Sequence, residues 1–255
     1  MKKHTTRTIR QFKNKSQKIQ MLTCYDYQTA KLLSETELDL VLVGDSLGNV
    51  ILGYDTTVRV SLEEMIIFTS AVKRGCPNKF VVGDLPFGTY NTVEEGLKSA
   101  TSLLQKSGCE AIKLEGAYPY QLELITRLTQ IGIPVMGHIG LTPQSVHEQG
   151  GYYTHGKNDP SAKSLMLKAK DLEKAGCFSI VLECIDKKVS EEITKEIHIP
   201  TIGIGSGTDV DGQVLVINDL LKLGSDYPPS FCEQIADLYT LKKELIVKYL
   251  NDRNE

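Results

Sequence analysis

The stretch Phe80-Val-Val-Gly-Asp-Leu-Pro-Phe87 decides how this 255-residue sequence folds. The apolar residues 80–82 lead into the acidic Asp84, and Pro86 follows two positions later. Proline has no N–H group to donate, so a strand that begins at residue 80 ends before it. A short buried strand that stops on a carboxylate places that carboxylate at the rim of a sheet.

The same design occurs at four other places in the chain. Apolar runs at 40–43, 111–114, 133–137 and 178–182 carry or precede the polar groups Asp45 and Ser46, Lys113 and Glu115, His138, and Glu183. Runs that are apolar on both faces are typical of a parallel sheet that helices cover on each side. Each run therefore delivers a reactive group to the same kind of position.

Strand and helix patterns alternate along the whole chain without a break in composition. We expect strands at 18–24, 40–43, 80–84, 111–114, 133–137, 178–182, 199–202 and 213–218. We expect helices at 6–15, 27–35, 61–74, 92–106, 119–130, 161–175, 190–196 and 229–250. Eight such units predict an α/β fold, a (β/α)8 TIM barrel, with a short N-terminal helix and a helical C-terminal tail; a doubly wound open sheet is the alternative. A single domain over residues 1–255 agrees with the usual barrel length of about 250 residues.

Composition excludes several classes of function. The formal net charge of −3 gives no electrostatic case for binding nucleic acid or an anionic membrane. No apolar run approaches the roughly 18 residues that a membrane-spanning helix needs. Six cysteines without a C-x-x-C pair indicate free thiols in a reducing, cytoplasmic setting.

The carboxylates at the strand ends suggest a metal site. In a barrel, Asp45, Asp84 and Glu115 would converge at the C-terminal face, where barrel active sites lie. Three carboxylates would repel one another, and a hard cation such as Mg²⁺ removes that penalty. The alternative is that each aspartate caps the following helix or binds loop amides.

The other strand-end groups allow two interpretations each. Lys113 and Glu115 point the same way along a strand, so Lys113 either holds a substrate oxygen or pairs with Glu115. Glu183 suits a general base, and otherwise pairs with a lysine. His138 faces the site or bonds to backbone. The glycine-rich residues 203–207 form a tight turn or a phosphate site, and the turn is favoured.

Several longer motifs resemble those of the ketopantoate hydroxymethyltransferase family. They are Thr-Cys-Tyr-Asp-Tyr (23–27), Val-Gly-Asp-Ser-Leu-Gly (43–48), Leu-Gly-Tyr-Asp-Thr-Thr (52–57), Asp-Leu-Pro-Phe-Gly (84–88), Lys-Leu-Glu-Gly (113–116), Gly-His-Ile-Gly-Leu-Thr-Pro-Gln (137–144) and Asp-Gly-Gln-Val-Leu-Val (211–216). The resemblance extends from about residue 23 to 221, and the sequence beyond Leu223 departs from the common pattern.

The resemblance implies an enzyme of pantothenate biosynthesis, on the route to coenzyme A. It would transfer a hydroxymethyl group from 5,10-methylenetetrahydrofolate to 3-methyl-2-oxobutanoate through a magnesium-stabilised enolate, giving 2-dehydropantoate, and would assemble as a cytoplasmic homodecamer. The resemblance also implies the roles of individual residues. Asp45, Asp84 and Glu115 would hold Mg²⁺; Asp45, Ser46, Asp84 and Lys113 would bind the oxo acid; Glu183 would be the proton acceptor; and His138 would support the reaction.

Two other functions stay open at the level of sequence. One is a Mg²⁺-dependent 2-oxo acid lyase or mutase of the phosphoenolpyruvate mutase type, which also handles enolates in a barrel. Such enzymes use further arginine or cysteine groups, which these strand ends lack. The other is a barrel that binds an oxo acid without turnover, and the complete set of acid and base groups argues against it.

Overall fold

The computed structural model describes residues 3–15 and 17–252 of the protein. These residues fall into two compact units, one that ends at Val214 and one that begins at Leu215. The boundary lies within the last strand, so the first unit contains every strand except for the final residue, Leu215, of that one. That the whole chain is a single domain stays a prediction.

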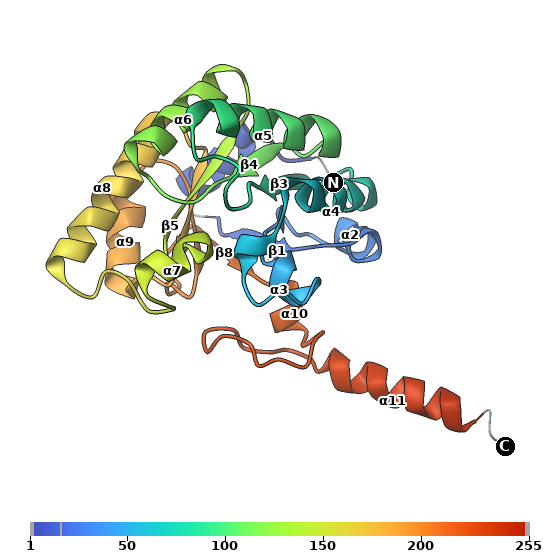
Figure 1. Cartoon of the computed structure of the whole chain (residues 1–255). Helices are drawn as coiled ribbons and strands as arrows, with labels where there is room; N and C mark the ends of the chain where they lie inside the picture. Colours follow the sequence, from blue (N-terminus) through green and yellow to red (C-terminus); the bar gives the residue numbers. More distant parts are fainter. Residues whose placement is uncertain (1–2, 16, 253–255) are drawn as a thin grey trace. The chain divides into compact units, whose positions relative to one another are not determined.

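The strands of the first unit form a closed parallel barrel, in which each pairs with the next along the chain (Figure 1). The strands are β1 (Ile19–Thr23), β2 (Leu40–Val43), β3 (Phe80–Asp84), β4 (Ala111–Lys113), β5 (Val135–Gly140), β6 (Ser179–Glu183), β7 (Thr201–Ile204) and β8 (Gly212–Leu215). The prediction of a (β/α)8 barrel is confirmed, and the open sheet is excluded. All strands run the same way, so their C-terminal ends meet at one face.

Helices cover the outside of the barrel. The first unit contains α1 (Thr6–Asn14), α2 (Tyr27–Ser34), α3 (Leu47–Val50), α4 (Leu62–Gly75), α5 (Val93–Ser107), α6 (Pro119–Gln130), α7 (Val146–Gln149), α8 (Asp159–Ala175) and α9 (Lys187–Glu196), with 3₁₀ turns η1 (Thr57–Arg59) and η2 (Pro143–Ser145). Their ends follow sequence signals. Ser61 and Glu64 form a capping box at the start of α4. Gly108, in the left-handed region at φ 75°, ends α5.

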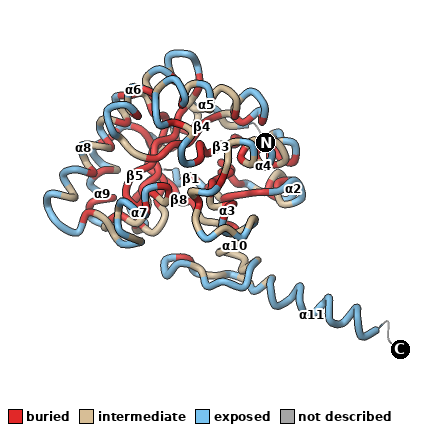
Figure 2. The backbone as a smooth tube through the Cα atoms, in the orientation of Figure 1, coloured by how far each residue is buried: buried red, intermediate tan, exposed pale blue. Residues whose placement is uncertain are grey.

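The core lies inside the barrel and between the strands and helices. Figure 2 shows the strands buried and the outward faces of the helices exposed. Side chains from the strands fill the interior, among them Leu40, Val82, Met136 and Ile202. Ile9 and Phe12 of α1 join the same cluster, so this amphipathic helix packs against the barrel through its apolar stripe.

Several expected elements differ from the structure. The fifth strand extends through His138 to Gly140, so the histidine lies within the strand. The eighth strand ends at Leu215 rather than residue 218, because α10 (Ile217–Leu220) follows directly. The short helix α3 lies between the strand at 40–43 and the helix from 61, where the sequence predicts no helix.

The second unit contains α10 and the C-terminal helix α11 (Leu238–Asn251). The sequence predicts a helix from residue 229, and that start is wrong. The Cys232 N–H donates to the Pro229 carbonyl in a turn, and Asp237 caps the helix by accepting from the Thr240 N–H. Among residues 3–15 and 17–252, no helix has the length and apolar character needed to cross a membrane.

Candidate active site

The structure brings all seven predicted site residues to the C-terminal face of the barrel. They come from the ends of β2 to β6: Asp45 and Ser46, Asp84, Lys113 and Glu115, His138, and Glu183. Asp45, Asp84, Lys113, Glu115 and His138 are at most 4% exposed, whereas Ser46 and Glu183 are only partly buried. A cluster of this charge in the interior is costly unless its members compensate one another.

Lys113 is the cation at the centre of the cluster. Its Nζ lies 2.7 Å from Asp84 Oδ2 and 3.9 Å from Glu115 Oε1. Burial lowers the pKa of the Lys113 ammonium, but the charges of Asp84, Glu115 and Asp45 outweigh that effect, so the pKa is raised. Lys113 therefore stays protonated, and the ion pair with Glu115 that the sequence offered as an alternative is secondary to the pair with Asp84.

His138 lies between two carboxylates. Its Nδ1 is 3.3 Å from Glu115 Oε1 and its Nε2 is 3.2 Å from Glu183 Oε2. These approaches are close in distance, but neither Glu115 Oε1 nor His138 Nε2 has a well-aligned hydrogen bond. Burial and Lys113 lower the pKa of His138, whereas Glu115 and Glu183 raise it more, to about 9. The ring thus contacts the site rather than loop backbone.

Asp45 is held by residues that the sequence did not single out. Gln144 donates from Nε2 to Asp45 Oδ2 over 2.8 Å. The neighbouring Ser46 has its own partner, because its hydroxyl lies 2.8 Å from that of Tyr25. The Oε1 atom of Gln144 in turn accepts from the hydroxyl of Tyr90. Gln144 is the last residue of the 137–144 motif, which was the only signal that pointed to it.

The carboxylates repel one another. Burial, then the charges of Asp84 and Glu115, raises the pKa of Asp45 well above its usual range. Burial also raises the pKa of Asp84, although Lys113 opposes it. Lys113 and the His138 ring supply two positive charges against the carboxylates of Asp45, Asp84, Glu115 and Glu183, so the site favours a further cation.

The donor set fits Mg²⁺. Two carboxylate oxygens, Asp84 Oδ1 and Glu115 Oε1, are buried without a hydrogen-bond partner. In the described part of the chain, no group of three or more His, Cys, Asp or Glu side chains is arranged so that it could hold a metal ion. Mg²⁺ does not need such a group, because it commonly uses one or two carboxylates and takes water or substrate oxygens for its other positions.

The backbone around Glu183 is tightly constrained. Its carbonyl accepts from the Leu141 N–H over 2.8 Å. Gly140, at φ 99°, lies so close that a Cβ there would be 2.1 Å from this carbonyl oxygen. The next residue, Cys184, adopts a left-handed φ of 48°, which is uncommon for a side chain other than glycine. The end of β6 therefore has a defined conformation.

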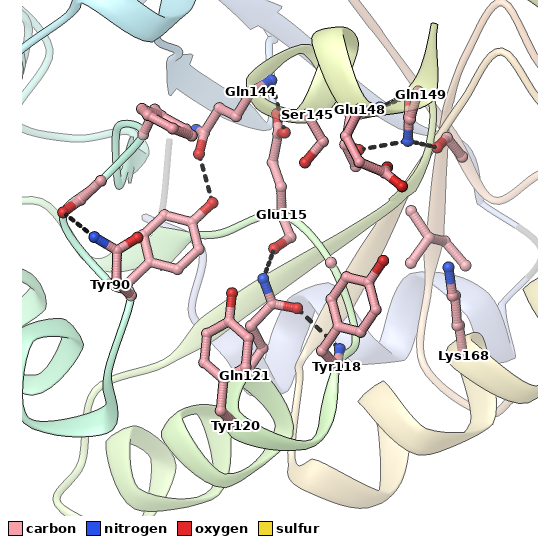
Figure 3. A pocket seen from close by; sticks show the side chains of 17 residues that line it. Tyr90, Glu115, Tyr118, Tyr120, Gln121, Gln144, Ser145, Glu148, Gln149 and Lys168 are labelled. Carbon is pink, nitrogen blue, oxygen red and sulfur yellow. Dashed lines mark hydrogen bonds between the residues drawn. The ribbon is translucent and has the colours of Figure 1, made fainter.

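A cavity opens next to this cluster (Figure 3). Glu115 and Gln144 line its inner side, and Phe87, Tyr118 and Tyr120 line it with aromatic rings. The ring of Tyr118 is more than half exposed, and the ammonium of Lys168 lies 5.8 Å from its centroid. The cavity thus joins a charged interior to an aromatic rim.

Glycines 203, 205 and 207 stay outside this arrangement. Gly205 and Gly207 have φ values of 64° and 82°, as a turn requires. The hydroxyl of Ser206 donates to the Leu182 carbonyl and accepts from the Ile185 N–H. These features agree with the tight turn.

Related proteins identify the family. The model of ketopantoate hydroxymethyltransferase matches residues 3–255. A 3-methyl-2-oxobutanoate hydroxymethyltransferase of Leptospira interrogans is 48% identical over 93% of this chain and 90% of its own length. An enzyme of the same name from Clostridium botulinum is 47% identical over 99% of this chain and 92% of its own.

Solved structures of low identity share the fold. A 2,3-dimethylmalate lyase of the PEP mutase/isocitrate lyase superfamily has a TM-score of 0.61 at 12% identity, over 82% of this chain and 80% of that one. A phosphonopyruvate hydrolase in complex with oxalate and Mg²⁺ has a TM-score of 0.63 at 9% identity, over 97% and 98%. At such low identities the similarity shows a shared fold alone. It therefore does not support a mutase activity for this protein.

The full-length family match and the relatives at nearly half identity agree with the predicted enzyme class. We conclude that the chain belongs to the ketopantoate hydroxymethyltransferase family.

Proposed function

We propose that the protein transfers a hydroxymethyl group from 5,10-methylenetetrahydrofolate to 3-methyl-2-oxobutanoate, which yields 2-dehydropantoate for pantothenate and coenzyme A synthesis. One observation carries the proposal. Asp45, Asp84, Lys113 and Glu115 are buried together at the barrel face, and Glu183 reaches the same cluster through His138. Such a site suits a small anionic substrate whose negative charge moves during the reaction.

Magnesium is the proposed cofactor, with Asp45, Asp84 and Glu115 as its ligands. When bound, it would polarise the ketone of the oxo acid and make the C3–H bond more acidic. The buried oxygens of Asp84 and Glu115 that lack partners support this assignment. A phosphonopyruvate hydrolase of the same fold has been solved with Mg²⁺ and oxalate, a dianion similar in shape to the head of a 2-oxo acid.

The side chains have complementary tasks in the proposed reaction. Lys113, with Asp45, Ser46 and Asp84, binds and orients the oxo acid, and its ammonium stabilises the charge that develops on the ketone oxygen. Glu183 takes the proton as the C3–H bond breaks. The new carbanion equivalent at C3 bonds to the methylene carbon of the folate, and both C–N bonds of that carbon are broken in the overall reaction. Water supplies the hydroxyl group, and the proton from C3 and one proton from water end on the folate nitrogens, so tetrahydrofolate leaves.

His138 supports Glu183 in this scheme. Its Nε2 lies 3.2 Å from Glu183 Oε2, so the ring limits where the carboxylate can lie. The Glu183 backbone is already restricted by its contact with Gly140 and its bond from Leu141. A base fixed in this way is oriented before the substrate binds.

The aromatic cavity is the proposed site of the folate. Tyr118 and Tyr120 offer faces on which a flat ring can stack, and Lys168 offers a cation for a carboxylate. Because Glu115 lines the inner side of the cavity, a one-carbon unit carried by that ring would face the oxo acid.

From the family resemblance we also propose that the protein assembles as a homodecamer and that it is located in the cytoplasm. The helix α11 has no buried residue, and its exposed apolar side chains include Leu241, Leu245 and Ile246. The cysteines are all free, as a reducing compartment requires. Light scattering coupled to size exclusion would measure the subunit number, and a monomer would contradict the assembly.

Proton exchange tests the function directly. The protein is mixed with 3-methyl-2-oxobutanoate in deuterated water, with and without Mg²⁺, and the C3 proton is followed by NMR. We expect its signal to disappear only with Mg²⁺, and product to form only when the folate is added. Absence of exchange with both metal and protein present would contradict the proposal, and turnover of the oxo acid without folate would favour a lyase.

A further inference from the structure

Gln144, in the turn η2 after β5, contacts carboxylates from two different strands. Its backbone N–H donates to Glu115 Oε2 over 3.1 Å, and its Nε2 donates to Asp45 Oδ2 over 2.8 Å. Nε2 also donates to the Leu85 carbonyl over 2.9 Å. The side chain is only 4% exposed, so water does not replace these bonds.

Tyr90 supplies the remaining bond. Its hydroxyl donates to Gln144 Oε1, and the tyrosine is 7% exposed. A rotation of the amide by 180° would place Oε1 against the Asp45 carboxylate and the Leu85 carbonyl, which both only accept hydrogen bonds. The donor on Oε1 and the two acceptors on Nε2 therefore define one orientation. Figure 3 shows the bond between Tyr90 and Gln144.

These bonds use one oxygen of each carboxylate. Gln144 occupies Oδ2 of Asp45 and Oε2 of Glu115, while Oε1 of Glu115 has no hydrogen bond. A carboxylate held through one oxygen presents the other in a fixed direction. Groups that orient metal ligands in this way affect affinity although they do not touch the ion.

We infer that Tyr90 and Gln144 are positioning residues, which orient Asp45 and Glu115 for a divalent cation bound together with the oxo acid. The inference rests on the proposed function, because it assigns a task to residues that support the proposed metal ligands. Tyr90 acts through Gln144, and Gln144 acts on both carboxylates at once.

Binding of Mn²⁺, measured by electron paramagnetic resonance with the oxo acid present, tests the inference without any turnover. Tyr90→Phe removes only a hydroxyl, and Gln144→Met removes the amide at nearly constant length. We expect each to weaken Mn²⁺ binding about 10- to 100-fold, the usual effect of losing such an outer group. Tyr54→Phe is the matched control, because it loses a 2.7 Å hydroxyl bond to Glu64 away from the site, and we expect wild-type affinity for it.

The dependence of the melting temperature on Mn²⁺ concentration provides a second readout. It reports affinity even in a variant that is less stable without metal. A merely structural role would lower the melting temperature of Tyr90→Phe and leave its Mn²⁺ affinity as in wild type, and that result would overturn the inference alone. If the wild-type protein bound no Mn²⁺, the proposed metal site would be wrong, and the inference with it.

Discussion

The Lys113 ammonium lies 2.7 Å from Oδ2 of Asp84, and both side chains are buried. The pair follows from the strand register, because Asp84 of β3 and Lys113 of β4 are direct neighbours across the sheet. The barrel therefore sets the charge pair through hydrogen bonds between its strands, and the loops do not have to position it.

Lys113→Met should destabilise the protein strongly and abolish binding of the oxo acid. Removing one partner of a buried ion pair leaves the other charge uncompensated, at a cost of about 3–5 kcal/mol in the free energy of unfolding. Denaturant unfolding measures the loss, and Mg²⁺ should restore part of it. Lys170→Met is the control, because its ion pair with Glu196 is exposed on the surface and its loss should cost far less. Equal losses in the two variants would show that the buried pair has no special role.

Glu183→Gln should keep binding of the oxo acid and Mg²⁺ but lose C3–H exchange into deuterated water. The amide has the shape of the carboxylate but cannot accept a proton, so only the chemical step fails. Calorimetry measures binding, and NMR measures exchange. We expect the exchange rate to fall at least about 100-fold below that of wild type. Exchange at the wild-type rate would remove Glu183 from the role of base.

Tyr118→Ala should raise the KM for the folate roughly 3- to 10-fold, because an exposed aromatic face on the cavity is lost. Because the proposed site of the oxo acid lies deeper, at Lys113, exchange of its C3 proton without folate should not change. Steady-state kinetics and NMR separate the two effects. Tyr227→Ala, at a residue 96% exposed in the second unit, is the control. An unchanged folate KM in Tyr118→Ala would contradict the assignment of the cavity.

Glu64→Gln should destabilise the protein more at pH 7 than at pH 3. The Ser61 N–H, the Tyr54 hydroxyl and the Ser61 hydroxyl lower the pKa of Glu64 in the folded state. A carboxylate with a lowered pKa stabilises the fold fully above its unfolded pKa of about 4.3 and loses that effect as the pH falls through the folded value. Glutamine can also complete a capping box, so we expect only the loss that comes from the missing charge, under about 1 kcal/mol at pH 7, measured by denaturant unfolding.

The control for this pH dependence is Glu63→Gln. Glu63 lies in the same first turn of α4 but is exposed and does not form the capping box. Both variants lose one charge near the helix start, so their difference isolates the cap. The same loss at both pH values in Glu64→Gln would contradict the assigned hydrogen bonds.

Sequence predicted the barrel because its strands are short apolar runs that carry their polar group at one end. The placement of Asp84 beside Lys113 could be predicted without knowledge of distant contacts, because the two residues end neighbouring strands that pair in parallel. The same logic predicted that Asp45, Glu115, His138 and Glu183 would converge, which the structure confirms as placement; their roles stay predictions.

Features that depend on specific long-range contacts could not be predicted in this way. Gln144 contacts Asp45, which is 99 positions away in sequence. Apart from its place in the 137–144 motif, nothing in the local sequence indicates that this uncharged side chain binds a carboxylate. Tyr90 has the same difficulty, since its partner is 54 positions away. The late start of α11 at Leu238 was missed because the residues from 229 have apolar character but form a turn first.

The crowding between Gly140 and the carbonyl of Glu183 has a consequence for redesign of this enzyme. Even alanine at position 140 would bring its methyl group within 2.1 Å of that oxygen unless the chain moved. Libraries should therefore keep this glycine invariant, whereas changes at Tyr118 and Tyr120 would alter the proposed folate site and leave this contact as it is.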